Sequence, residues 1–301
     1  MYEFDSPVFE MLVGVAGAGK STFARIEAKF IEELTHVECV ICSSDAIRGE
    51  LWGNESDQRE PSKVFQVMLH RTREALAAGK SVIYDAANIE EKYRLQILQQ
   101  IKPYDCYKVC TVFIERPEVC VERQKLRERK VPEHVIWRQI RKFQPPEYYE
   151  GWTAIRVFSN PYNDEVVEQL KPMRDFDQHN PHHTLTLDAH CVRAADIAVK
   201  KNYYYSVNEA ALFHDVGKIY TQEFDENGVA HYYGHENVSA YFYFLLSGKN
   251  AQDGGLEIAW LISHHMDFFK GERYMEKLRS RAGDYFYTAL RQLHECDLEA
   301  H

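Results

Sequence analysis

The chain has 301 residues, of which 45% are hydrophobic and 27% are charged. This length favours two domains, and the composition excludes a disordered or fibrous protein. The net charge of −10 is uneven, because residues 1–158 carry 23 basic against 24 acidic side chains and residues 159–301 carry 13 against 22.

Export and membrane signals are missing from the sequence. The longest apolar stretch near the N-terminus is Met11-Leu12-Val13, and the acidic start MYEFDSPVFE is atypical of a secretory signal. We therefore expect a cytoplasmic protein without membrane contact. The seven cysteines lack the spacing of a disulfide framework. Cys39 and Cys42 form a CxxC, but the apolar pattern HVECVIC around them favours buried strand thiols over a zinc or redox pair.

The first part of the chain alternates strand-like and helix-like segments. The four strand candidates are VFEMLVGV (8–15), HVECVIC (36–42), SVIYDA (81–86) and VCTVFI (109–114). A helical pattern over residues 62–79 ends at Gly79, where a helix C-cap is expected. Strands that alternate with helices predict an α/β domain with a parallel sheet over residues 1–158.

The residue composition and the predicted secondary structure change after this domain. Residues 159–176 combine Asn, Pro and mixed charges, which is typical of a linker. Strand signals nearly vanish over residues 177–301, and this segment is predicted to form an all-α domain. Its helical candidates are the segments 185–200, 207–215, 236–246, 255–265 and 284–298.

The segment GVAGAGKST, from Gly14 to Thr22, fits G-x-x-x-x-G-K-[ST] between a predicted strand and a predicted helix. Backbone N–H groups of such a loop close around phosphates, and the helix N-terminus adds its positive end. Lys20 would reach the β- and γ-phosphates and Ser21 would bind Mg²⁺. The alternative is a chance glycine turn. The predicted ATP site comprises Gly14, Gly17, Ala18, Gly19, Lys20, Ser21, Thr22 and Arg123.

Acidic and basic side chains follow two other predicted strands. Asp45 and Arg48 in SSDAIR come directly after a strand that we expect beside the phosphate loop. Asp45 can accept the proton of an attacking hydroxyl and Arg48 can bind an acceptor phosphate. The alternative is a helix N-cap with a surface arginine. Asp85 ends the next strand and can hold the Mg²⁺ water shell.

Two further residues near that strand carry weaker signals. Asn88 is a weaker candidate for acceptor binding, and Arg94 is interpreted as a helix-surface residue.

Residues 123–142 hold eight basic and two acidic side chains. This patch either binds a phosphate-rich ligand or is a solvated helix face. Arg123 and Arg127 are four residues apart, so they are predicted to share a helix face, as in a lid that neutralises charge on the transferred phosphoryl group. Arg129 and Lys130 could do the same.

These segments together resemble the phage-type 5′-polynucleotide kinase family. The resemblance rests on GVAGAGKST, SSDAIR, VIYDAAN, ERxxxRxxxVP and PPEYYEGW, and covers about half of the chain. It implies a P-loop kinase with a helical lid that uses ATP and Mg²⁺. It also implies that Asp45 is the general base, that Arg48 contacts the acceptor's 3′-phosphate and that Arg127 contacts ATP. This sequence departs from the family at Gln124, where an Asn often follows the first lid arginine.

The second part of the chain is rich in His and Asp at predicted helix ends. Two vicinal pairs, His214-Asp215 and His264-His265, join His190, His235 and Asp297 as possible ligands. Neighbouring side chains on a helix diverge by about 100°, so a vicinal pair converges only at a helix end or on a shared metal. Seven such ligands suffice for two divalent metals of the Zn, Fe, Ni or Mn type bridged by one carboxylate. Taken singly, each histidine is better explained by a core or surface role, so the metal-site prediction rests on the cluster.

The order H…HDxGK…GHE…HH…D resembles the HD phosphohydrolase superfamily over residues 177–301. The resemblance implies that the core metal ligands are His190, His214, Asp215 and Asp297. It implies that the additional ligands of two-metal members are His235, His264 and His265. Asp284 is a rival to Asp297, and His183 is either near the site or structural. Lys218 would bind a substrate phosphate or is a helix-end lysine.

Together the two parts resemble bifunctional HD–polynucleotide kinase end-healing enzymes, although the order of the domains is reversed. This implies that ATP phosphorylates 5′-hydroxyl ends of RNA or DNA. The HD domain would then open a 2′,3′-cyclic phosphate or remove a terminal phosphate with Mn, Ni, Co, Zn or Fe, before a separate ligase acts. The rivals are a nucleoside or small-metabolite kinase fused to an HD nucleotidase, and an ATP-gated sensor that binds a signal nucleotide.

Overall fold

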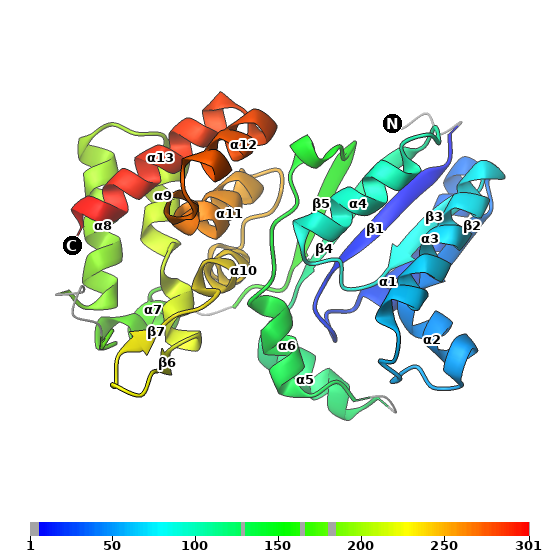
Figure 1. The fold of residues 1–301 in the computed structure, drawn as a ribbon, viewed down its shortest axis with the longest axis horizontal. Coiled ribbons are helices and arrows are strands. Elements are labelled where there is room, and N and C mark those ends of the chain that lie inside the picture. The colour runs from blue at the N-terminus through cyan, green and yellow to red at the C-terminus, as the bar shows by residue number, and fades with distance from the viewer. Residues whose placement is uncertain (1–5, 128–129, 163–165, 180–184, 301) are drawn as a thin grey trace. The chain divides into compact units, whose positions relative to one another are not determined.

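The computed structural model describes residues 6–127, 130–162, 166–179 and 185–300. The chain divides into two compact units (Figure 1). The first comprises Met1–Trp137 and Glu150–Phe158, and the second comprises Arg138–Tyr149 and Ser159–His301. The N-terminal α/β domain and the C-terminal helical domain expected from the sequence are both confirmed.

A five-stranded sheet in the order β2-β3-β1-β4-β5 forms the centre of the first unit (Figure 1). The pairs β1–β3, β1–β4 and β2–β3 are parallel, as expected. The strands are β1 (Val8–Gly14), β2 (Cys39–Ser43), β3 (Ser81–Asp85), β4 (Tyr107–Ile114) and β5 (Ala154–Ser159). The helices that connect them are α1 (Lys20–Thr35), α2 (Ser44–Trp52), α3 (Pro61–Ala77), α4 (Glu91–Ile101), α5 (Pro117–Lys125) and α6 (Glu133–Ile140).

Two features of this sheet differ from the sequence-based expectation. Strand β2 does not lie beside β1, because β3 is inserted between them. The strand β5 (AIRVFS) at the far edge was not predicted, although Ile155, Arg156 and Val157 alternate as in a strand. The burial explains the successful predictions: β1 and β3 are buried along their whole length, so most of their residues are apolar, with the buried Glu10 as the exception inside β1.

Parallel pairing brings the carboxyl ends of three strands to one edge of the sheet. Leu12 of β1 lies opposite Asp85 of β3, and Ser43 of β2 lies opposite the same Asp85. Side chains that follow these strands can therefore converge, although they are far apart in the sequence.

Helices dominate the second unit, with α10 at its core. Its helices are α7 (Val166–Arg174), α8 (Leu187–Lys200), α9 (Tyr205–Phe213), α10 (His235–Ser247), α11 (Gly255–His264), α12 (Glu272–Ala282) and α13 (Asp284–Glu299). Short 3₁₀ turns are η1 (Tyr148–Glu150), η2 (Val216–Tyr220) and η3 (His265–Lys270). The consecutive aromatic residues 241–244 of α10 are all buried, which fits a helix packed on every side.

Two elements of this unit were not predicted. The segment 159–176, expected to be a linker, contains α7, whose Met173 is buried. A short antiparallel hairpin joins β6 (Glu223–Phe224) to β7 (Ala230–His231) through a turn at Gly228. Two-residue strands leave almost no periodic signal in a sequence.

Among the described residues, no helix is long and apolar enough to cross a membrane. All seven cysteines are free thiols. Cys42 is buried as expected, whereas Cys39 on the edge strand β2 is only partly buried.

Candidate functional sites

The predicted phosphate loop joins β1 to α1. Gly17 and Gly19 have φ angles of 89° and 99°, which residues other than glycine rarely adopt. In addition, a Cβ at Gly17 would lie 2.8 Å from the carbonyl oxygen of Cys120. Helix α1 begins at Lys20, so the first-turn N–H groups of Lys20, Ser21 and Thr22 face the loop end of the helix. The Lys20 Nζ donates to the carbonyl oxygens of Gly14 (2.8 Å) and Val15 (2.9 Å). The loop thus has the backbone donors and the cation that a phosphate requires. Ala18 is buried within it.

Ser21 and Asp85 lie together at the end of β3. The Ser21 side chain hydrogen-bonds the Asp85 carboxylate. Burial raises the pKa of Asp85, against the attraction of Lys20 and this hydrogen bond. Burial lowers the pKa of Lys20, and the negative charge of Asp85 opposes the shift. A hydroxyl and a carboxylate are hard oxygen donors that suit Mg²⁺, so this pair fits the ion that the phosphate loop implies.

Asp45 and Arg48 lie in the first turn of α2, at the same edge of the sheet. Arg48 Nη1 and Asp45 Oδ1 form an ion pair at 2.7 Å, and the Arg48 side chain is largely buried. The negative charge of Asp45 acts on the pKa values of both Lys20 and Asp85. Asp45 and Lys20 therefore belong to one electrostatic site rather than to two separate ones.

The arginines of the predicted lid are arranged differently from the expectation. Helix α5 ends at Lys125, and Arg127 lies beyond it, so Arg123 and Arg127 do not share a helix face. Arg123 donates through Nη1 to the carbonyl oxygen of Gly17 (3.0 Å) and pairs through Nη2 with Glu115 Oε2 (2.9 Å).

The positive charge of Arg127 lowers the pKa values of Lys20 and Asp85, so Arg127 also acts on this site. Arg129 lies outside the described residues, and Lys130 is exposed.

Arg94 was interpreted as a surface residue, and this was wrong. Its side chain is fully buried and binds Glu150 through two bonds, Nε to Oε2 at 2.9 Å and Nη2 to Oε1 at 2.7 Å. Its Nη1 also donates to the carbonyl oxygen of Asn88. Asn88 adopts φ 50° and donates to the carbonyl oxygen of Leu12 (2.8 Å). Both side chains hold the segment after β3 in place, and Glu150 carried no signal in the sequence.

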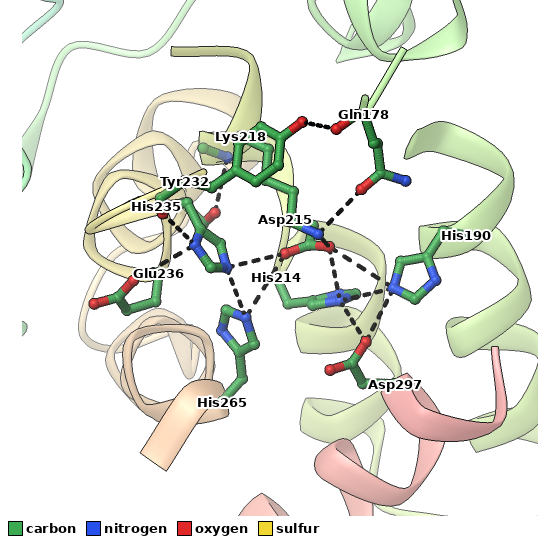
Figure 2. Close-up of polar contacts among 12 residues, drawn as sticks. Gln178, His190, His214, Asp215, Lys218, Tyr232, His235, Glu236, His265 and Asp297 are labelled. Carbon is green, nitrogen blue, oxygen red and sulfur yellow. Dashed lines mark hydrogen bonds and ion pairs between the residues drawn. The ribbon is translucent and has the colours of Figure 1, made fainter. Parts of the chain in front are cut away.

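A cluster of buried imidazoles and carboxylates occupies the second unit (Figure 2). It contains two groups whose ligand atoms lie within 4.8 Å of one another: His190, His214 and Asp215, and Asp215, His235 and His265. These side chains come from α8, the end of α9, the start of α10 and the end of α11. The structure thus brings together residues that are up to 75 positions apart.

Asp215 is shared by both groups. Its Oδ2 lies 3.7 Å from His190 Nε2 and 3.5 Å from His214 Nε2. Its Oδ1 lies 3.2 Å from His235 Nε2 and 3.7 Å from His265 Nε2. Helix α9 ends at Phe213, so His214 and Asp215 leave the helix and point to one place, which a helical interior would not allow.

Backbone carbonyls fix the orientation of three of these rings. His214, His235 and His265 each place Nδ1 at 2.7 Å from a carbonyl oxygen three residues earlier, of Ala211, Tyr232 and Ile262. A neutral ring that donates from Nδ1 presents an unprotonated Nε2. The Nε2 atoms of His235 and His265 lie 3.1 Å apart, an approach that a cation or a proton between the two rings stabilises.

Asp297 joins the first group from α13. Its Oδ1 lies 3.0 Å from His190 Nε2 and 3.4 Å from His214 Nε2. Its rival Asp284 is mostly exposed and pairs with Arg279 at 2.6 Å. The first group therefore offers two imidazole nitrogens and two carboxylates, a donor set that fits a divalent transition metal.

His264 lies outside both groups. Its ring stacks on Trp260 with centroids 4.1 Å apart, and its Nδ1 lies 2.9 Å from the Trp260 carbonyl oxygen. Its Nε2 lies 4.0 Å from Oδ2 of the buried Asp267. His264 ends α11 and His265 begins η3, and their rings diverge because His264 stacks on Trp260 whereas His265 turns to Asp215.

Lys218 contacts the shared carboxylate. Its Nζ lies 2.6 Å from Asp215 Oδ2 and 3.1 Å from Gln178 Oε1, and its side chain is buried. The main-chain carbonyl of Gln178 in turn accepts a hydrogen bond from the Tyr232 hydroxyl (2.5 Å) (Figure 2). Gln178 and Tyr232 were not predicted, since neither residue type marks a metal site. His183 lies outside the described residues.

The charges of the cluster compensate one another. Burial opposes ionisation of Asp215, but Lys218 and His214 outweigh it and hold the pKa of Asp215 well below its usual value. Burial alone would lower the pKa of His214, yet the negative charge of Asp215 raises it well above 6.5. Burial lowers the pKa of His265 to about 3, so this ring is neutral at physiological pH. The two carboxylates of the first group thus offset the positive charges beside them, and His265 of the second group is a neutral nitrogen ligand.

Two family matches cover most of the chain. Residues 10–146 match the AAA domain family, and residues 187–298 match the HD domain family. A curated relative, the L-seryl-tRNA(Sec) kinase of Methanococcus maripaludis, is 26% identical over 171 residues. That alignment covers 52% of this chain and 64% of the relative, so the chain spans less than two thirds of the relative's length.

Solved structures also resemble parts of the chain. A putative kinase from Chloroflexus aurantiacus is 18% identical with a TM-score of 0.34, over 39% of this chain and 65% of its own. A chain of the Pnkp1/Rnl/Hen1 RNA repair complex is 22% identical with a TM-score of 0.39, over 46% of this chain and 44% of its own length. A fungal RNA kinase is 16% identical with a TM-score of 0.38, over 56% of this chain and 43% of its own length. On the family matches, the chain joins an N-terminal P-loop kinase-like domain to a C-terminal HD domain.

Proposed function

We propose that this chain is a bifunctional enzyme that heals nucleic-acid ends. Its kinase domain would transfer the γ-phosphoryl group of ATP to the 5′-hydroxyl of RNA or DNA. Its HD domain would hydrolyse a 2′,3′-cyclic or terminal phosphate. The observation that carries the kinase part is the ion pair of Asp45 and Arg48 in the same electrostatic site as Lys20.

The kinase reaction needs a base, a phosphate cradle and charge stabilisation. Asp45 takes the proton of the acceptor hydroxyl as the oxygen–phosphorus bond forms and the β–γ bridging bond of ATP breaks, releasing ADP. The loop amides and Lys20 hold the phosphates, and Arg123 and Arg127 offset the developing charge. Ser21 and Asp85 would hold Mg²⁺, which supplies charge neutralisation between the β- and γ-phosphates.

The position of Arg48 supports the proposal that the acceptor carries a phosphate of its own. Its guanidinium is a rigid donor fork suited to phosphate, and it is already placed beside the proposed base. A 3′-phosphate on the terminal nucleotide would compete with Asp45 for Arg48 and would leave Asp45 available for the hydroxyl proton. The relative in Methanococcus maripaludis, a kinase named for a tRNA-linked serine, also supports an acceptor joined to RNA.

The HD site would act on the other end of a break. Asp215 between the two groups carries this part of the proposal. Divalent ions bound there would supply an activated water and stabilise the phosphoryl oxygens. His190, His214, Asp215 and Asp297 would hold one ion, while Asp215, His235 and His265 would hold another. Lys218 keeps the shared carboxylate ionised and in place. A separate ligase would then seal the healed ends.

A direct test of the kinase part compares three acceptors. Purified protein with Mg²⁺ and γ-labelled ATP is offered a 5′-hydroxyl oligonucleotide, a nucleoside 3′-monophosphate and a nucleoside. We expect the label on the first two, with a lower KM for both than for the nucleoside. Label on the nucleoside alone would contradict the polynucleotide proposal and favour a metabolite kinase. RNA and DNA oligonucleotides of one sequence would show the preferred nucleic acid.

The HD part is tested separately with metal-stripped protein. Mn, Ni, Co, Zn or Fe is added back, and the conversion of a 2′,3′-cyclic phosphate end into a 2′- or 3′-phosphate monoester is followed. We expect activity with at least one of these metals and its loss in His214→Ala. Hydrolysis of free nucleotides without any action on polynucleotide ends would instead indicate a nucleotidase.

A further inference from the structure

Gln124, in the last turn of α5, is a buried residue with half of its amide unused. Only 3% of its surface is exposed. Its Oε1 accepts a hydrogen bond from the backbone N–H of Val131 at 3.3 Å. Its Nε2 has no hydrogen-bond partner in the part of the chain that the structure describes. Buried polar atoms are nearly always paired, so an unpaired donor next to a binding loop points to a ligand.

The unpaired Nε2 lies against the phosphate loop. A Cβ built on Gly17 would lie 3.0 Å from it, so a side chain at position 17 would displace the amide. The neighbouring Arg123 reaches the same part of the loop, with Nη1 on the Gly17 carbonyl oxygen and 3.9 Å from a Cβ at Gly19. Two consecutive residues of α5 therefore bring N–H donors to the loop.

We propose that Gln124 is a further ligand of the ATP phosphates, with its Nε2 donating to a phosphate oxygen. The bound anion would pair the donor that burial leaves unpaired, while Oε1 stays on Val131. Because α5 carries Gln124 and Arg123 side by side, the same hydrogen bond would hold this helix against the nucleotide. The inference rests on the proposed use of ATP by this loop.

The test measures nucleotide binding rather than turnover. The full-length wild type, Gln124→Met and the control Glu122→Gln are titrated with MgATP, and adenosine is measured by competition. Glu122 is an exposed residue of the same helix that pairs only with Lys125 in the described structure. Met has the length of Gln without its polar atoms. We expect Gln124→Met to weaken ATP binding by about 10- to 100-fold, as for a hydrogen bond to a charged group, and to leave adenosine binding unchanged.

A second variant separates the donor from the packing. Gln124→Glu keeps an oxygen for the Val131 N–H but replaces the donor by a negative charge. We expect it to weaken ATP binding at least as much as Gln124→Met. Circular dichroism at the assay temperature checks that this variant is folded, because a carboxylate at this buried position costs stability.

Equal ATP affinity in the wild type and in both Gln124 variants would overturn the inference and leave the proposed kinase intact. An equal loss of ATP and adenosine binding would also overturn it, since that pattern indicates a purely structural role. A wild type that binds no ATP would instead overturn the proposed kinase, and the inference with it.

Discussion

The two candidate sites differ in what holds them together. The phosphate loop is built from the backbone between Gly14 and Lys20, and its surrounding side chains range from buried to exposed. The HD cluster is built from side chains alone, which come from several helices and compensate one another's charge. A backbone site is set by a few consecutive residues, whereas a charge cluster depends on every member at once.

The strongest test of this difference is removal of the shared carboxylate. Asp215→Ala takes a ligand from both groups and leaves the buried Lys218 unpaired. We expect phosphoesterase activity to fall by at least about 10³-fold and bound metal to be lost, because charge stabilisation disappears at both metal positions. The measurements are metal content by mass spectrometry and hydrolysis of a 2′,3′-cyclic phosphate.

The matched control for this variant is Asp196→Asn, an exposed carboxylate on the helix that carries His190. It should keep full activity. Kinase activity should stay at the wild-type level in Asp215→Ala. Normal metal content in this variant would contradict the assignment of Asp215 as the shared ligand.

Asp45→Asn tests the corresponding carboxylate of the kinase site. It removes the proposed base but leaves the loop amides and Lys20 in place. We expect kcat to fall by about 10²- to 10³-fold with little change in the KM for ATP. A steady-state assay with varied ATP and acceptor separates the two parameters. Asp57→Asn, in an exposed pair with Arg59, is the control; an Asp45→Asn enzyme with wild-type kcat would exclude Asp45 as the base.

Arg94 and Glu150 form a buried charge pair in the kinase domain, and this pair sharpens the comparison. Arg94→Met leaves the buried Glu150 without its cation, although Trp152 Nε1 still donates to it, which should destabilise the first unit by about 3–5 kcal/mol. Arg71→Ala removes only an exposed pair with Glu50 and should cost less than about 1 kcal/mol. Urea unfolding followed by circular dichroism measures both values. Similar losses for the two variants would show that burial does not govern these pairs.

A last prediction concerns a thiol beside the phosphate loop. Burial raises the pKa of Cys120 to about 12, with a smaller contribution from Glu115. The thiolate fraction grows only as the pH approaches that value, so Cys120 stays protonated from pH 7 to 9. Its alkylation by iodoacetamide at pH 8.5 should be about 10³-fold slower than that of an ordinary thiol. Mass spectrometry of native and urea-unfolded protein checks this, and equal labelling would contradict it.

Much of the first domain could be predicted from the sequence because its signals are local. The apolar runs of β1 and β3 follow from burial on both faces, and the glycines of the loop follow from its backbone angles. Strand β5 and the burial of Arg94 could not be predicted. Both depend on partners far along the chain, namely β4 and Glu150.

By itself, the sequence determined the two domain types, the position of the phosphate loop and the set of residues able to bind metals. Only the tertiary structure decided that Asp215 lies between two groups, that His264 turns to Trp260 and that Arg127 lies beyond α5. The physical reason is that a loop or a strand is shaped by interactions over a few residues. The convergence of His190 with Asp297, however, depends on how whole helices pack.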